Sequence, residues 1–206
     1  MARNPQQNEK MREERTLQIR NAALRLFASK GLAATKMRDI AEAVGMAQGL
    51  MYHYYSSKDS IYQELILDAL DKMNAAVFHL RDVAAPPHQK IEMAVEKILE
   101  TIRDSEDFVQ TCKLIAGAVG SVEFPEDVKA EIEIKREIPY SEISKILTSG
   151  QSEGTIRAGD PDQLAILFWT IINGLAIYRA TRKEAVLLPE SRLITGMFIT
   201  EKGLME

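Results

Sequence analysis

The residues best suited to chemistry gather in residues 35–58, which read TKMRDIAEAVGMAQGLMYHYYSSK. Hydroxyl and ammonium groups are common partners of DNA phosphates, and arginine, glutamine and histidine can hydrogen-bond to base edges. Elsewhere the chain offers little to an enzyme: it has no phosphate-binding glycine loop, no GxSxG, no HExxH and no obvious carboxylate pair. The pattern favours nucleic-acid binding over catalysis.

We predict two kinds of DNA contact within this stretch. Phosphate contacts set the register of a protein on the duplex, whereas side chains at the front of a recognition helix read the bases. The predicted phosphate contacts are Thr35, Tyr52, Tyr54 and Lys58. The predicted base-reading residues are Met46, Gln48 and His53, with Arg38 reaching in from the preceding helix. Gln48 suits adenine and Arg38 suits guanine.

Two short helices must position these side chains. Apolar residues at helical spacing, from Met37 to Val44, predict a first helix that Thr35 can cap. Gly45 provides the positive φ of a sharp turn, and a second helix covers about 48–54. Ile40, Val44 and Met51 are expected to face inward, as is Tyr55, so the segment reads as a helix-turn-helix.

This segment resembles the TetR family of transcriptional regulators over about residues 19–65. The matching residues of the family pattern are Gly49, Met51, Tyr52, Tyr54, Tyr55 and Lys58. Ala47 departs from it, because the family more often opens the recognition helix with serine or threonine, and this loses a side-chain cap. The resemblance implies a dimer on a palindromic operator, released by a small molecule held among helices of the larger domain.

Periodicity predicts an all-α fold of about nine helices. The expected division is a helix-turn-helix domain at 1–57, with 1–10 a disordered arm, and an effector and dimerisation domain at 58–206. Gly31 should end the first helix, Ser56 and Ser57 should cap a long one, and Pro139 should kink or split another. The last two helices are expected at about 161–182 and 189–202.

Net charge separates the same two parts. The whole chain carries −4, which by itself argues against nucleic acid as a partner. Residues 1–60 carry +4 and residues 61–206 carry −8, so a basic part precedes an acidic one. We therefore expect DNA binding to be confined to the first part.

The helix beginning near Asp162 is apolar nearly all round, which a domain of this size cannot bury alone. A second subunit would cover it in a two-fold four-helix interface. The predicted interface residues are Leu175, Tyr178, Leu193 and Met197. The candidate effector-binding residues are Phe108, Cys112, Tyr140, Trp169 and Asn173, although for each residue alone ordinary core packing is the more common explanation. The many aliphatic residues favour a hydrophobic or amphipathic effector.

Several classes of function are excluded by composition. One cysteine, Cys112, rules out an internal disulfide, and the isolated His53, His79 and His88 predict no metal site and no cofactor. The longest apolar run, 165–178, is short for a membrane span, and no signal sequence is recognised, so a cytoplasmic protein is expected. Two alternatives stay open: a helical adaptor that has lost DNA affinity, and an activator instead of a repressor.

Overall fold

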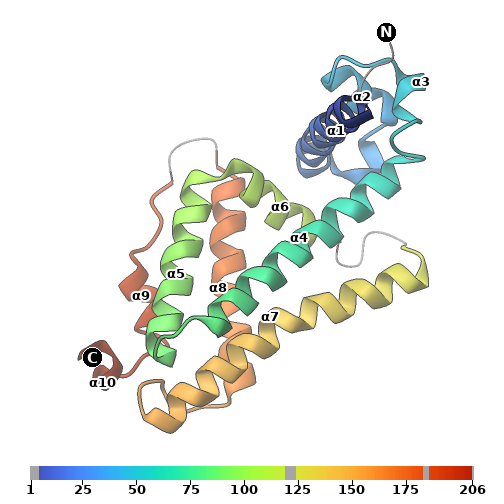
Figure 1. Cartoon of the computed structure of the whole chain (residues 1–206). Helices are drawn as coiled ribbons and strands as arrows, with labels where there is room; N and C mark the ends of the chain where they lie inside the picture. Colours follow the sequence, from blue (N-terminus) through green and yellow to red (C-terminus); the bar gives the residue numbers. More distant parts are fainter. Residues whose placement is uncertain (1–4, 119–123, 183–185, 206) are drawn as a thin grey trace.

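A computed structural model describes residues 5–118, 124–182 and 186–205. The described part is all-α with ten helices, one more than the predicted number. The helices are α1 (Pro5–Ala34), α2 (Met37–Ala43), α3 (Gln48–Met51), α4 (Lys58–Asp82), α5 (Pro87–Asp104), α6 (Glu106–Ala118), α7 (Glu126–Glu153), α8 (Pro161–Ala180), α9 (Ser191–Thr195) and α10 (Glu201–Met205). We call α1–α3 the head and α5–α10 the body; α4 runs from one to the other (Figure 1).

The head is built around one hydrophobic cluster, the head core. Its centre is the buried face of α1, with Ile19 and Ala23, against Ile40 of α2 and Met51 of α3. The first half of α4 adds residues from Ile61 to Leu70, and α6 and α7 add others. The predicted boundary between residues 57 and 58 coincides with the start of α4, yet the head core extends across it.

The body has its own cluster, the body core, in which α8 is central. Ala165, Phe168, Trp169, Ile172 and Ala176 of α8 are all buried there. Phe168 packs edge-on against Trp169, with ring centroids 5.3 Å apart. The second half of α4 joins this cluster through Val77, so one helix contributes to both cores.

Local signals explain where these helices begin and end. Ser57 caps α4 by accepting a hydrogen bond from the Ser60 amide at 3.1 Å, as its sequence position predicts. Asp160 caps α8 in the same way, and Pro161 occupies its first position. Gly31 has a φ of 80°, so the regular part of α1 ends there, as expected.

Two predictions about the elements are wrong, and for a third the structure excludes one of the two expected outcomes. Residues 5–10 of the expected disordered arm are the first turns of α1, because they are mostly good helix formers. Of the kink or split expected at Pro139, the split is excluded, because α7 runs on to Glu153 as one helix. No helix spans 189–202: between the short α9 and α10, Ile199 forms a β-bridge with Ile156. Main-chain bonds from Arg157 to Phe198 (2.8 Å) and from Thr200 to Thr155 (2.9 Å) hold that segment extended.

In the described part of the chain, α8 alone is long and apolar enough to cross a membrane by length and composition. The apolar run counted in the sequence is shorter than this 20-residue helix. A core helix of a soluble protein passes the same test, and the buried residues of α8 form the centre of the body core.

Candidate nucleic-acid interface

The turn between α2 and α3 has the geometry of a helix-turn-helix. Gly45 has a φ of 63°, which confirms the predicted need for glycine. The Met46 amide donates to the Ala41 carbonyl at 2.9 Å and closes the turn. Ala47 precedes α3 without a side-chain cap, as its residue type predicts.

Buried residues fix the two helices against the head. Ile40 and Met51 are fully buried and Val44 is half-buried, so all three face inward as predicted. The other sides of α2 and α3 face solvent, where Arg38 and Gln48 are exposed. Tyr52 and His53, in the turn after α3, are exposed as well.

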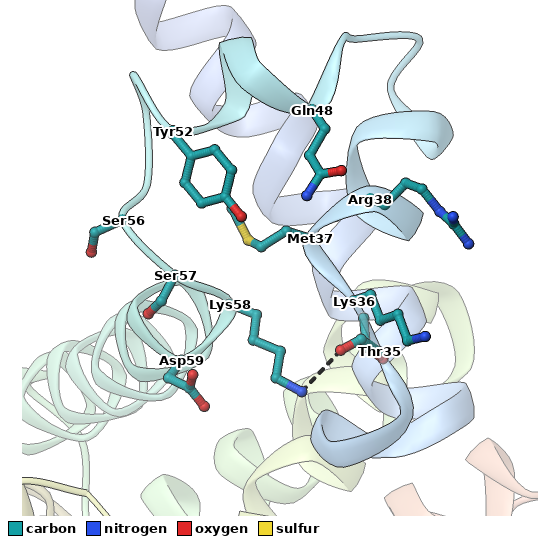
Figure 2. A pocket seen from close by; sticks show the side chains of 10 residues that line it. All are labelled: Thr35, Lys36, Met37, Arg38, Gln48, Tyr52, Ser56, Ser57, Lys58 and Asp59. Carbon is teal, nitrogen blue, oxygen red and sulfur yellow. Dashed lines mark hydrogen bonds between the residues drawn. The ribbon is translucent and has the colours of Figure 1, made fainter.

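An open groove of about 480 Å³ lies between the start of α2, α3 and the start of α4 (Figure 2). It brings together five of the eight predicted DNA contacts. The residues that line it are Thr35, Lys36, Met37, Arg38, Gln48, Tyr52, Ser56, Ser57, Lys58 and Asp59. Arg38 forms an exposed ion pair with Glu42 at 3.5 Å, which contributes little energy and leaves the guanidinium free to exchange partners.

Met46, His53 and Tyr54 are not among the groove residues. Met46 and Tyr54 are partly buried and pack against the head core, whereas His53 is exposed. Of these three predicted contacts, His53 presents the most accessible side chain to a partner.

Thr35 has a structural role that removes it from the set of phosphate contacts. Its side chain is fully buried, and its hydroxyl donates to the Gly31 carbonyl at 2.8 Å. The predicted capping role is wrong as well, because Lys36 occupies the N-cap of α2. The Asp39 carboxylate accepts a bond from the Lys36 amide at 3.1 Å and so closes this end of the helix.

Lys58 also points into the protein. Its ammonium donates to the carbonyl oxygens of Leu32 (2.7 Å), Thr35 (3.0 Å) and Ala33 (3.3 Å). Figure 2 shows the bond to Thr35 at the floor of the groove. An ammonium has three N–H donors, and all three are engaged here. In this conformation Lys58 ties the start of α4 to the end of α1 and has no donor left for a phosphate.

Tyr55 joins the head to α4, in agreement with its predicted core position. Its side chain is buried, and its hydroxyl donates to the Glu64 carboxylate at 3.2 Å. Burial, followed by the charge of Glu64, raises the pKa of Tyr55 above its usual value. Arg20 of α1 forms ion pairs with both Glu64 (3.2 Å) and Asp68 (2.6 Å) of α4. Together with the Tyr55 hydroxyl, these side chains form one polar network that joins α1, Tyr55 and α4.

The structure adds groove residues that the sequence interpretation missed. Lys36 and Ser56 are exposed and line the groove with polar groups that suit phosphates. The sequence feature that could have identified them is their position at the ends of the motif, next to Thr35 and Ser57. Asn74 was also missed: it is a buried amide of α4 whose oxygen has no hydrogen-bond partner. It lies in an apolar stripe between Leu70 and Val77, which was its signal.

The predicted effector-binding residues do not form one set. Phe108, Cys112 and Tyr140 are partly buried against the body core, and the Trp169 indole donates to the Pro139 carbonyl at 3.1 Å. Burial raises the pKa of the Cys112 thiol to about 11, which keeps the thiol protonated and unreactive at neutral pH. Asn173 is exposed on α8, apart from these four. No group of three or more histidine, cysteine or acidic residues in the described ranges is arranged to hold a metal.

The outer face of α8 is apolar and exposed. Ile166, Leu167 and Tyr178 are exposed there together with Asn173 and Gly174. Leu175, a predicted interface residue, is partly buried against the body core. Leu193 and Met197 are exposed, but their neighbours Ile194 and Phe198 belong to the body core and not to an outer helix face.

Comparison with known proteins fits this geometry. Residues 19–65, which span the end of α1 through the first part of α4, match the sequence profile of the bacterial regulatory proteins of the TetR family. Residues 19–65 of the chain therefore have the sequence of a TetR-family helix-turn-helix domain. This match agrees with the resemblance predicted from the sequence over the same residues.

Some sequence relatives align with only part of this chain. The HTH-type transcriptional repressor KstR2 of Mycolicibacterium smegmatis is 35% identical over 80 residues. That alignment covers 39% of this chain and 38% of KstR2, so the chain aligns with less than half of that relative.

Solved structures of the same fold extend the likeness to the body. The ketosteroid regulator KstR2 of Mycobacterium tuberculosis superimposes with a TM-score of 0.72 at 23% identity, over 91% of this chain and 96% of the other. AibR in complex with isovaleryl coenzyme A and operator DNA gives a TM-score of 0.72 at 18% identity, over 89% and 95%. At these identities the likeness establishes the fold.

Proposed function

We propose that this protein is a transcriptional regulator, a repressor, that binds a palindromic DNA operator. The observation that carries the proposal is the exposed groove of the head, where Lys36, Arg38, Gln48 and Tyr52 surround a helix-turn-helix whose inner side is fully packed. The positive charge of the first sixty residues supports it. A bacterial DNA-binding regulator of this kind acts in the cytoplasm.

Single substitutions in the groove test DNA binding. Arg38→Ala and Gln48→Ala should each weaken specific binding by about 1–3 kcal/mol and relax the preference at the base that each reads. Fluorescence anisotropy with an operator selected from random duplexes measures both effects. Arg103→Ala is the matched control, because Arg103 is an exposed arginine of the body. Unchanged affinity and specificity in both head variants would contradict the assignment, and the absence of any DNA binding would favour the helical adaptor.

We place the dimer interface on the outer face of α8. Its exposed apolar residues need a cover, and Gly174 offers open space where a helix of a second subunit can approach closely. The second helix of each subunit is then α7, which packs along α8, instead of the predicted C-terminal helix. A two-fold dimer would present two α3 helices to half-sites about 34–36 Å apart.

We propose that a hydrophobic or amphipathic effector binds in the body and changes the spacing of the two heads. Two observations support this: α4 contributes to both cores, and Asn74 leaves a buried amide oxygen unpaired between Leu70 of the head core and Val77 of the body core. AibR, which has the same fold, binds isovaleryl coenzyme A together with operator DNA.

The effector proposal is tested by native mass spectrometry of the purified dimer and by operator titrations with and without ligand. Isovaleryl coenzyme A is a suitable first probe. A coupling of about 1–3 kcal/mol corresponds to a 5–150-fold change in operator affinity. A compound that binds the body but leaves operator affinity unchanged is not the effector.

A further inference from the structure

The part of α3 that faces away from the protein is defined by its buried residue. Met51 is fully buried and marks the inner side. With about 100° per residue, Gly49 lies on the side opposite Met51 and Leu50 lies beside it; Tyr52 and His53 follow in the turn after α3. All four are exposed. They form the exposed surface of α3 and of the turn that follows it, and we call these four residues the outer side of α3.

Gly49 stands at the centre of this outer side without an internal reason for being glycine. It is not among the glycines with positive φ, and a Cβ added to it would meet no atom within 4 Å. Glycine in a helix is nevertheless about 1 kcal/mol less favourable than alanine. A position that neither conformation nor packing explains indicates that something outside the chain approaches the backbone closely there.

Leu50 is the aliphatic residue next to Gly49 and the open space beside its backbone. It is 47% exposed and belongs to neither hydrophobic core. Its backbone is held on both sides, because its amide donates to the Ala47 carbonyl (2.9 Å) and its carbonyl accepts from the His53 amide (3.1 Å). The side chain is therefore presented from a fixed position beside an open approach.

We propose that Leu50 contacts the C5-methyl group of a thymine and selects thymine at one position of each half-site. In the major groove thymine alone presents an apolar group, its methyl, to which an aliphatic side chain can pack. The proposal rests on the proposed function, since it assigns a base preference to the same DNA-binding surface. It adds an apolar contact to the polar ones expected from Arg38, Gln48 and His53.

Uracil substitution tests this contact. An operator is first selected from random duplexes with the full-length dimer, and each of its thymines is then replaced by uracil, which removes the methyl and keeps base pairing. At one symmetric position the wild-type protein should lose about four-fold in affinity for one half-site and about 15-fold for both, since one apolar methyl group is lost at each. Leu50→Ala should bind the thymine and uracil duplexes equally well.

Leu204→Ala is the matched control. Leu204 is 52% exposed and lies in α10, at the end of the molecule opposite the head (Figure 1). This variant should keep the full dependence on thymine. If no thymine replacement affects the wild type, or if Leu50→Ala keeps the same dependence, Leu50 does not read a methyl group, while the proposed DNA binding stands. Failure to select any operator would overturn the proposed function and this contact together.

Discussion

At the scale of single residues, the Lys58 side chain stabilises the head through hydrogen bonds to its backbone. Its position in the motif suggested a phosphate contact, yet its ammonium is bound by three carbonyl oxygens at the end of α1. Carbonyls that end a helix need donors, and a charged donor forms strong hydrogen bonds. We infer that Lys58 keeps α4 in register with the rest of the head.

Replacing Lys58 should therefore lower stability. For Lys58→Met we expect a loss of about 1–3 kcal/mol in the free energy of unfolding, because the carbonyls lose their charged donor. Urea denaturation followed by circular dichroism measures it. Lys97→Met, at an exposed lysine that pairs with Glu100, should change stability by less than about 0.5 kcal/mol. If the Lys58→Met protein kept its stability but bound DNA more weakly, Lys58 would be a phosphate contact, as the sequence predicts.

Because of Tyr55, the free energy of unfolding should fall at alkaline pH. The folded protein raises the pKa of Tyr55 through burial and through Glu64, whereas an unfolded tyrosine titrates near its usual value of about 10. Above that pH the unfolded chain releases a proton that the folded protein retains, so stability falls as pH rises.

Tyr55→Phe should reduce that loss. Urea denaturation at pH 8 and at pH 10.5 measures the difference, with Tyr178→Phe as the control because Tyr178 is exposed. Tyr62, whose pKa burial also raises, should retain part of the effect in the variant. An identical pH dependence in wild type and Tyr55→Phe would show that the phenol of Tyr55 does not produce the loss.

At the scale of elements, α8 serves two surfaces. Its inner side fills the body core with Phe168 and Trp169, and its outer side leaves Ile166 and Leu167 in solvent. The cost of exposing these groups disappears if a second subunit covers them. We therefore propose that the dimer interface lies on this outer face, which the body core leaves exposed.

A charge on the outer face of α8 should break the dimer. We expect Ile166→Arg to be folded and monomeric at micromolar concentration, because an arginine would be buried without a partner at the interface. Light scattering coupled to size exclusion gives the mass. Met93→Arg, at an exposed apolar residue of α5, should remain dimeric. A dimeric Ile166→Arg protein would place the interface on another surface.

At the scale of the whole molecule, net charge is positive in the part proposed to bind DNA and negative in the rest. The first sixty residues, which include the groove of the head, carry +4, and the remaining residues carry −8. Affinity for DNA should fall steeply with salt because bound counterions are released when basic groups meet phosphates.

The salt dependence assigns individual phosphate contacts. Lys36→Gln should weaken binding on all sequences and reduce the slope of log affinity against log salt by about 1 for each half-site. Titrations between about 50 and 200 mM salt measure this slope. Lys97→Gln should leave it unchanged, because Lys97 lies on the body. An unaltered slope for Lys36→Gln would exclude this lysine from the backbone contacts.

The sequence by itself determined the local structure of the head. Gly45, Ser57 and Gly31 act through backbone conformation and short-range hydrogen bonds, and the apolar spacing of Ile40 and Met51 defines an inner face. These effects involve neighbouring residues, so a pattern is enough to recognise them. The all-α fold and the likeness of residues 19–65 to the TetR family followed from the same features.

Only the tertiary structure decided what distant residues do. Lys58 meets carbonyls about 25 residues away in sequence, Ile199 pairs with Ile156 in place of a C-terminal helix, and Asn173 turns to solvent instead of a pocket. In each case more than one local arrangement was available, and packing against another part of the chain selected one. Helical periodicity shows that a residue lies on a face, but the neighbouring element decides whether that face is core, interface or DNA contact.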